Sequence, residues 1–382
     1  MYRVGKDGVE HTKNGDAPPR SLIAAVGAHG LRTEGHPAPA RPLGDAAWKA
    51  LLEAADFNRV TAHLYAALKD GMLPATDVQV AELRKRLLEW AAHTLRLQAA
   101  LPGLVEQLVA GTDYRLLKGP ALAHADYANP SLRMYTDLDV LVPASSIDRT
   151  VERLSTAGAV RRRPEQAPGF DRRFGKGATF HMPAGYELDL HRTLTPFAFG
   201  LALDPDTLFE RLEILRLGGT EVRILAREER LLHACYHAAL GNVPPTVGQL
   251  RDVAELLRSA PTDTDRVLSL AERAHALVVV ARAIRLTVGD LRLADDAPLI
   301  HWAREYVPTR RDRRLLAPYL ADKPIARELA ILSVLPGWGP RAAYVRARMV
   351  PQRSYMATRH GGGYVSHWWR SVLHLLRIRK LR

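Results

Sequence analysis

Two carboxylates on one short strand constrain the fold of this chain more than any other feature. Asp137 and Asp139 lie within residues 135–142, whose aromatic, β-branched and leucine side chains are typical of a β-strand that ends before Pro143. Residues two apart on a strand point to the same face, so both carboxylates are directed at one point. Like charges this close repel each other unless a cation lies between them, and oxygen ligands suit Mg²⁺. The pattern predicts a metal site on a β-sheet.

A third carboxylate is expected from a later strand. Residues 178–190 are predicted to form a hairpin, because two runs of strand-forming residues flank a Pro-Ala-Gly turn. Asp189 is the preferred third ligand, and Glu187, which points to the same face, stays open as the alternative. With Asp137 and Asp139 this residue would complete a site for one or two metal ions.

Three histidines and one further acid are candidates for supporting roles around this site. For His191, a hydrogen bond to a carboxylate is favoured over a direct metal contact. His233 and His237 have helical i, i+4 spacing, but they lack the intervening Glu and the third ligand of a zinc site, so packing or inter-helix hydrogen bonding is favoured. Asp252 is expected near this acidic site, where it contacts a bound ligand or braces a loop.

Length and composition predict a globular protein of about two domains. The chain has 382 residues and contains no apolar run long enough to span a bilayer, which takes about eighteen residues. Its first residues lack the apolar core of a signal peptide, and its single cysteine, Cys235, lies in an apolar helical context. We expect a cytoplasmic protein in which Cys235 is a small buried side chain.

The net charge of +13 is concentrated at one end of the chain. Residues 301–382 contain 17 Lys and Arg against 4 Asp and Glu, whereas residues 1–300 contain 37 of each sign. Because the acidic motifs lie in the neutral part, we expect neither polymerase activity nor sequence-specific binding of nucleic acid.

The chain is expected to contain five regions. Helical spacing of apolar residues covers Asp45 to Lys69 and Asp77 to Leu108, where Pro102 is expected to interrupt the second stripe. Later helices are predicted at 246–257, 262–275 and 276–286. The regions are a weakly ordered N-terminal segment (1–42), an N-terminal helical region (43–111), a small α/β domain (112–225), a helical domain (226–340) and a basic tail that ends in an amphipathic helix (341–382).

The order of motifs resembles a known family. Lys118-Gly119 follows a short strand, Arg133 comes next, and then come Asp137-x-Asp139 and Asp189. This order resembles the polymerase-β-like nucleotidyltransferases, and more narrowly the bacterial uncharacterised nucleotidyltransferase family. The resemblance covers roughly residues 45–380. It implies an α+β protein in which a small α/β domain with a mixed sheet is flanked by N-terminal helices and a C-terminal helical domain.

The resemblance also implies a reaction. An acceptor oxygen attacks the α-phosphorus of a nucleoside triphosphate, with ATP the expected donor, and pyrophosphate leaves. Asp137, Asp139 and Asp189 would be the catalytic, metal-holding residues for Mg²⁺ or Mn²⁺. Lys118, Gly119 and Arg133 would bind the nucleotide: Lys118 as a point charge, Gly119 through close approach of its backbone, and Arg133 as a bidentate fork. The acceptor is not defined.

Other interpretations stay open. Asp-x-Asp also occurs in metal-dependent glycosyltransferases, although the helical region ahead of the motif does not match their larger nucleotide-binding domain. A catalytically silent partner of biosynthetic enzymes, or a toxin–antitoxin component, is another class. Arg133 is also suited to a structural ion pair with Asp126 or Asp137. In the tail, the amphipathic segment 364–382 either packs on the same chain or makes peripheral contact with an anionic membrane.

Overall fold

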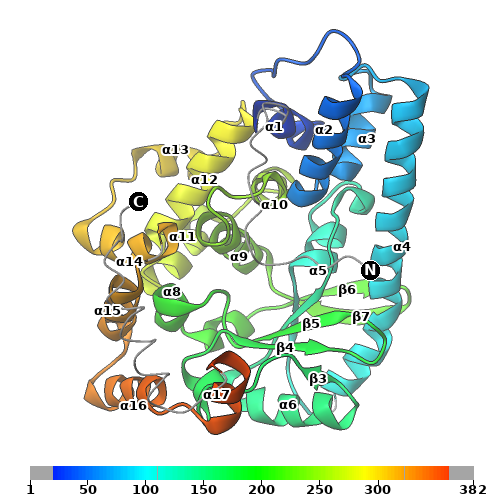
Figure 1. The fold of residues 1–382 in the computed structure, drawn as a ribbon. Coiled ribbons are helices and arrows are strands. Elements are labelled where there is room, and N and C mark those ends of the chain that lie inside the picture. Colours follow the sequence, from blue (N-terminus) through cyan, green and yellow to red (C-terminus); the bar gives the residue numbers. More distant parts are fainter. Residues whose placement is uncertain (1–19, 110, 322, 361–382) are drawn as a thin grey trace.

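One seven-stranded sheet lies at the centre of the α/β region (Figure 1). The computed structural model describes residues 20–109, 111–321 and 323–360. The strands are β1 (Arg115–Leu117), β2 (Leu138–Leu141), β3 (Val160–Arg161), β4 (Gly177–His181), β5 (Glu187–His191), β6 (Glu213–Leu217) and β7 (Thr220–Ile224). Their order is β3-β4-β5-β2-β1-β7-β6, with β2 parallel to β5, β1 parallel to β7, and the other neighbours antiparallel. The sheet is mixed, which confirms the predicted α+β class and the β4–β5 hairpin.

Helices precede, cover and follow this sheet. Before it come α1 (Arg20–Ala28), α2 (Asp45–Asn58), α3 (Thr61–Lys69) and α4 (Asp77–Val109). Between the strands lie α5 (Lys118–Ala125), η1 (Pro130–Leu132), η2 (Ala144–Ser146), α6 (Ile147–Thr156), α7 (Phe170–Arg173), α8 (Phe197–Ala202) and η3 (Pro205–Phe209). After it come α9 (Arg227–Leu240), α10 (Val247–Arg258), α11 (Thr264–Arg273), α12 (Leu277–Leu291), α13 (Pro298–Glu305), α14 (Arg310–Leu320), α15 (Pro324–Val334), α16 (Trp338–Met349) and α17 (Arg353–His360).

The two faces of the sheet pack on different parts of the chain. In β2, Leu138 and Val140 belong to a buried cluster that includes Leu97 and Leu101 of α4 and Leu154 of α6. The alternate residue of the same strand, Leu141, belongs to the large buried cluster of the N-terminal and C-terminal helices. Because side chains alternate along a strand, Asp139 shares the face of Leu141 and is directed away from α4 and α6.

Helix α4 differs from the sequence-based expectation at Pro102. The helix continues through this proline to Val109, although proline cannot donate the usual intrahelical hydrogen bond. Leu101 and Leu104 on either side are buried in the cluster under the sheet, so tertiary packing offsets the local cost. Leu88 and Leu95, both within the segment expected to carry an apolar stripe, are exposed.

The structure also differs from the expected weak order at the N-terminus. Residues 20–28, inside the segment 1–42, form α1, in which seven residues are buried against α10 and α12. The Arg251 guanidinium donates to the carbonyl oxygens of Gly27 at 2.7 Å and His29 at 2.6 Å, which fixes the end of this helix. These partners are more than two hundred residues away, so local composition did not reveal them.

Two further expectations concern membranes. Within the described ranges, no helix combines the length and the apolar character that are needed to cross a bilayer. The amphipathic segment 364–382, for which we expected either packing or peripheral membrane contact, lies outside the described residues.

Candidate active site

Strand register brings two of the expected acids side by side. In the parallel pair β2–β5, Asp139 is the direct partner of Asp189, and Leu138 is the partner of Leu188. Both acids follow the alternation that sends their apolar neighbours into the cluster under α4 and α6, so both carboxylates lie on the opposite face. The chemistry-bearing side chains therefore lie on the sheet face that packs toward the helical core.

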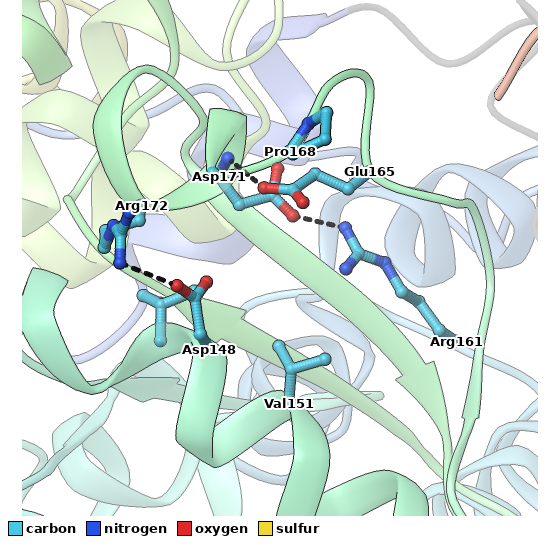
Figure 2. A pocket seen from close by; sticks show the side chains of 9 residues that line it. Asp148, Val151, Arg161, Glu165, Pro168, Asp171 and Arg172 are labelled. Atoms are coloured by element: carbon cyan, nitrogen blue, oxygen red, sulfur yellow. Dashed lines mark hydrogen bonds and ion pairs between the residues drawn. The ribbon is translucent and has the colours of Figure 1, made fainter. Parts of the chain in front are cut away.

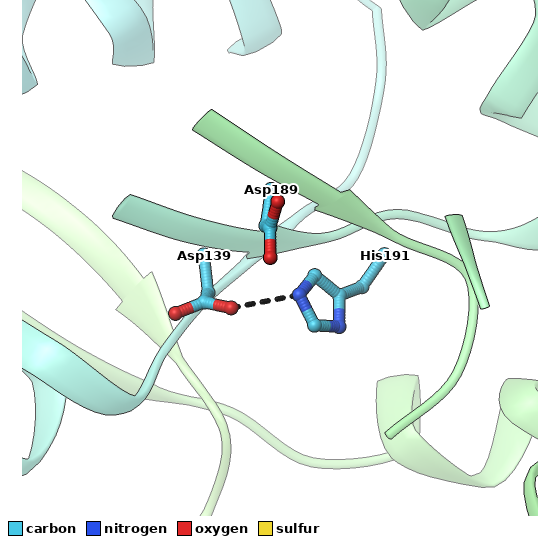
Figure 3. Close-up of side chains that lie close together, drawn as sticks. All are labelled: Asp139, Asp189 and His191. Atoms are coloured by element: carbon cyan, nitrogen blue, oxygen red, sulfur yellow. Dashed lines mark hydrogen bonds and ion pairs between the residues drawn. The ribbon is translucent and has the colours of Figure 1, made fainter. Parts of the chain in front are cut away.

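A third side chain joins this pair. One ligand atom each from Asp139, Asp189 and His191 lies within 4.8 Å of the others. Figure 3 shows the His191 ring beside the Asp139 carboxylate, with Nε2 at 2.8 Å from Oδ1, and the Asp189 carboxylate close to both. On the neighbouring strand β4, the Thr179 hydroxyl donates to Asp189 Oδ1 at 2.6 Å. Two carboxylates and an imidazole are a donor set that fits a divalent cation.

Glu187, the alternative third ligand, lies elsewhere in the strand. It is the partner of His181 in the β4–β5 register, and its carboxylate lies 3.6 Å from both Arg162 and His181. It is not part of the Asp139–Asp189–His191 group.

The turn from β1 to α5 holds a lysine against Asp139. Lys118 has a positive φ of 41°, which L side chains rarely adopt, and its Nζ lies 2.6 Å from Asp139 Oδ1. Gly119 follows, and a Cβ there would lie 3.1 Å from the Tyr135 ring. The missing side chain thus allows the turn to pack closely on Tyr135, which directs Lys118 toward the acids.

The pKa values of Asp137 and Asp139 are shifted in opposite directions. Burial acts to raise the pKa of Asp139, but the charge of Lys118 and the hydrogen bond with His191 outweigh it and hold that pKa well below its ordinary value. For Asp137, burial and the charge of Asp139 raise the pKa to about 6, because Lys118 compensates only in part. Asp139 is therefore the more strongly ionised of the two acids.

Arg133 lies in a bidentate ion pair rather than alone. Its Nε and Nη2 donate to the two carboxylate oxygens of Asp252 at 2.6 and 2.8 Å, and the Tyr127 hydroxyl donates to the same carboxylate at 2.8 Å. This joins the loop before β2 to α10. We expected an ion pair with Asp126 or Asp137 as an alternative, and Asp126 pairs instead with Arg230 at 2.8 Å.

One cation of the site, Arg59, was not expected from the sequence. Arg59, which ends α2 with φ 59°, lies with its guanidinium carbon 5.3 Å from the centroid of the Trp90 ring. Burial lowers the pKa of Arg59, and Asp137 is the acid that counteracts this most strongly. No local motif marks Arg59, because it precedes the acids by some eighty residues in the sequence and reaches them through the packing of α2 on α4.

The two histidines of α9 also lie near the site. Burial and the positive charge of Lys118 hold the pKa values of His233 and His237 well below their ordinary value, and the carboxylate of Asp139 acts on both in the opposite direction. Both side chains are therefore neutral at pH 7.

The cavity beside α6 and α7 is separate from these acids. Its volume is about 420 Å³, and Figure 2 shows that its charged lining is already paired: Arg161 with Asp171, and Arg172 with Asp148 at 2.9 Å. Neither Asp139 nor Asp189 lines it, so we do not assign the chemistry to this cavity.

The mixed sheet and its acids define the class of this protein. A family model described as "Uncharacterised nucleotidyltransferase" matches residues 44–288, which is more than half of the chain. The chain belongs to this nucleotidyltransferase family, as the motif order indicated.

Solved structures of nucleotidyltransferases are similar only at low identity. One is an antigenic nucleotidyltransferase-like protein from Paracoccidioides brasiliensis (16% identity, 54% of this chain and 97% of that one, TM-score 0.33). Others are the antibiotic-resistance factor ANT(2'')-Ia (14%, 48% and 96%, TM-score 0.34) and the lincosamide antibiotic adenylyltransferase LnuA bound to lincomycin (15%, 43% and 96%, TM-score 0.27). No curated protein matches the chain. TM-scores this low support no inference about the substrate.

Proposed function

We propose that this protein is a divalent-metal-dependent nucleotidyltransferase that moves an NMP group from an NTP to an acceptor and releases pyrophosphate. ATP is the proposed donor, and the acceptor is a small molecule, a peptide or a protein. The observation that carries the proposal is the pairing of Asp139 with Asp189 across β2 and β5, with His191 beside them, in a member of a nucleotidyltransferase family. Family membership supports this reaction over the glycosyltransferase alternative.

The donor set of the site fits Mg²⁺ or Mn²⁺. Asp139 and Asp189 would hold the metal, and His191 would fix the orientation of the Asp139 carboxylate. Asp137 precedes β2 and lies outside the Asp139–Asp189–His191 group, so its role as a further metal ligand stays a prediction. Bound there, the metal would neutralise the charge that develops on the phosphoryl oxygens. Burial contributes most to the pKa of about 6 for Asp137 and the charge of Asp139 adds to it; a bound cation would counteract the second effect.

The cationic residues would bind the triphosphate. The strained turn holds Lys118 Nζ 2.6 Å from Asp139. A triphosphate bound to a metal at Asp139 would therefore lie beside the positive charge of Lys118, which would stabilise the negative charge of the phosphoryl oxygens. Gly119 keeps this turn compact against Tyr135. Both hydrogen bonds of Arg133 to Asp252 stabilise the loop before β2, and a direct contact of Arg133 with the nucleotide stays a prediction.

Purified variants test the proposal directly. We expect the chain to release pyrophosphate from ATP in the presence of Mn²⁺ or Mg²⁺ and a mixed acceptor extract. Asp139→Asn and Asp189→Asn should each lower this rate by at least about a thousandfold, since each removes a charge from the site. The matched control is Glu187→Gln, which makes the same change two residues from Asp189 on the same strand face and should keep the wild-type rate.

Three outcomes would contradict the assignment. One is unchanged turnover in both aspartate variants. Another is a rate in Glu187→Gln as low as that in Asp189→Asn, which would move the third ligand to Glu187. The last is a failure of all four NTPs to release pyrophosphate while the wild-type chain still binds Mn²⁺, which would favour a catalytically silent partner protein.

A further inference from the structure

An exposed apolar stripe lies along α16. Trp338, Ala342, Val345 and Met349 follow the spacing i, i+4, i+7, i+11, which places them on one face of a helix. All four are exposed: Trp338 at 84%, Val345 at 44% and Met349 at 40% of their accessible surface, with Ala342 in the same class. We call these four residues the α16 stripe. Large exposed apolar side chains in one line mark an interaction surface.

The other face of α16 is already anchored to the protein. Tyr344 is buried in a small cluster with Phe174, whose ring centroid lies 5.3 Å away, and with Ile331 and Leu335 of the α15 region. The Tyr344 hydroxyl donates to Glu328 at 2.7 Å. The stripe is therefore a second face of a fixed helix, and Figure 1 shows α16 at the edge of the molecule, away from the sheet.

Arginines border the stripe on both sides. By helical periodicity Arg346 lies on one side of the stripe, and Arg341 and Arg348 lie on the other. Arg348 also pairs with Glu328 at 2.9 Å, so Arg346 and Arg341 are the main border cations. Arg341 also contacts the face of Trp338, 5.9 Å from the ring centroid. Residues 338–360 contain five arginines and no Asp or Glu. An apolar line between basic borders is the pattern of helices that lie in the interface of a bilayer, with Trp and Arg at the level of the headgroups.

The charge and the apolar surface of this region together favour one kind of partner for the stripe. A second copy of the chain would bring two strongly basic surfaces together, since residues 301–382 contain 17 basic and 4 acidic side chains. A soluble polyanion would use the arginines but leave Trp338, Val345 and Met349 in water. An anionic lipid surface satisfies both the charge and the apolar contact.

We propose that the α16 stripe and its bordering arginines dock on the surface of an anionic phospholipid bilayer. The proposal goes beyond the proposed function and does not depend on it, because it rests only on exposed residues of α16 and on the charge that follows. It also differs from membrane contact through residues 364–382, because all of its residues belong to the described helix and its C-terminal neighbourhood.

Co-sedimentation of the full chain with vesicles tests the apolar part. We expect binding to vesicles of equal parts phosphatidylcholine and phosphatidylglycerol, and little binding to pure phosphatidylcholine. The double variant Trp338→Ser with Val345→Ser should lower the partition coefficient at least about tenfold. The matched control, Leu88→Ser with Leu95→Ser, removes side chains of 70% and 63% exposure from α4, where acidic and basic residues alternate, and should bind like wild type.

A second pair of variants tests the charge. Arg346→Glu with Arg353→Glu should lower binding at least about tenfold, and 0.5 M NaCl should do the same to wild type. The control is Arg84→Glu with Arg96→Glu, the same change at exposed positions of α4. All of these side chains are exposed, so thermal melting should match wild type and confirm that each variant folds.

Each contrary result overturns the proposal. Equal binding of wild type and the Trp338/Val345 variant would show that the stripe does not touch lipid. Equal binding to neutral and anionic vesicles would remove the role of the arginines. Failure of wild type to sediment with anionic vesicles, together with arginine-dependent binding of an RNA oligonucleotide, would assign the surface to nucleic acid instead.

Discussion

At the scale of single residues, the neighbours of each acid decide what that acid can do. Asp139 is paired with Lys118 and His191, which stabilise its ionised form, whereas Asp137 keeps a pKa of about 6. Asp189 has a different kind of partner, the hydroxyl of Thr179. A neutral donor orients a carboxylate without competing for its charge, which suits a ligand that must bind a cation.

Replacing Thr179 should weaken metal binding without removing any ligand. Thr179→Val keeps the shape of the side chain but loses the 2.6 Å hydrogen bond to Asp189 Oδ1. We expect the Mn²⁺ concentration for half-maximal pyrophosphate release to rise by roughly 10- to 100-fold, while the rate at saturating Mn²⁺ changes little. Thr179→Ser keeps the hydroxyl and should stay near wild type. If Val and Ser behave alike, the hydrogen bond does not orient Asp189.

A site residue could be predicted from the sequence when its position depends on its near neighbours in the chain, and not when it depends on a distant partner. Local rules of strand alternation and turn sequence placed Asp139 and Asp189 each on a strand, whereas their pairing joins β2 and β5 fifty residues apart. The bidentate partner of Arg133 was not predictable, since Asp252 lies more than a hundred residues later on α10. Arg59 was missed for the same reason: only the packing of α2 brings it near Asp137.

At the scale of elements, predictions succeeded where a pattern was long and periodic. Helical segments at 45–69, 77–108 and 246–257 were expected from their stripes and are present, the first as the two helices α2 and α3 and the last with a capping box at Thr246. Helix α1 was missed because its nine residues follow a stretch rich in Gly and Pro and are stabilised by distant helices. The prediction that Pro102 interrupts the helix was wrong for a related reason: the packing of α4 outweighs the low helix propensity of proline.

One glycine controls the contact between β4 and the strand that carries Asp189. Gly177 pairs with His191, and a Cβ at its φ of 154° would lie 1.8 Å from the carbonyl oxygen of Leu190. Gly177→Ala should lower the free energy of unfolding by about 3 kcal/mol and reduce turnover, because β5 must move. Gly185→Ala in the hairpin turn has a positive φ of 80° but no atom within 4 Å, so it should cost only about 1 kcal/mol. Urea unfolding measures both, and equal losses would contradict the clash.

The ion pair between Arg133 and Asp252 should be important for stability. Asp252 is buried and the Arg133 side chain is only 12% exposed, so Asp252→Asn would leave a largely buried guanidinium without its paired carboxylate. We expect a loss of about 3–5 kcal/mol in the free energy of unfolding. The double variant Arg133→Met with Asp252→Asn removes the charge as well and should recover part of this loss. Losses that simply add in the double variant would show that the two residues do not depend on each other.

At the scale of the whole molecule, the two larger buried clusters pack on opposite faces of the sheet. One lies between the sheet and α4 and α6, and the other joins the N-terminal and C-terminal helices and contacts the acidic face of the sheet. The site therefore lies at the boundary of two packed layers, where polar groups must be paired or neutral. His63, on α3, is an example of a polar group that is neutral. Its side chain is buried, and neither ring nitrogen has a hydrogen-bond partner among the described residues.

The buried His63 should make the protein less stable in acid. Burial and the positive charge of Arg251 hold its pKa in the folded state well below 6.5, whereas in the unfolded chain the imidazole takes up a proton near pH 6.5. Below that pH the unfolded state binds more protons than the folded state, so the free energy of unfolding falls, by up to about 1.4 kcal/mol per pH unit for this group. His63→Phe removes the group, and its unfolding free energy should decline less steeply between pH 6.5 and 5 than that of wild type. Above pH 7 the difference between the two proteins should be constant, and urea unfolding at a series of pH values measures it. Parallel curves over the whole range would mean that His63 is protonated to the same extent in both states.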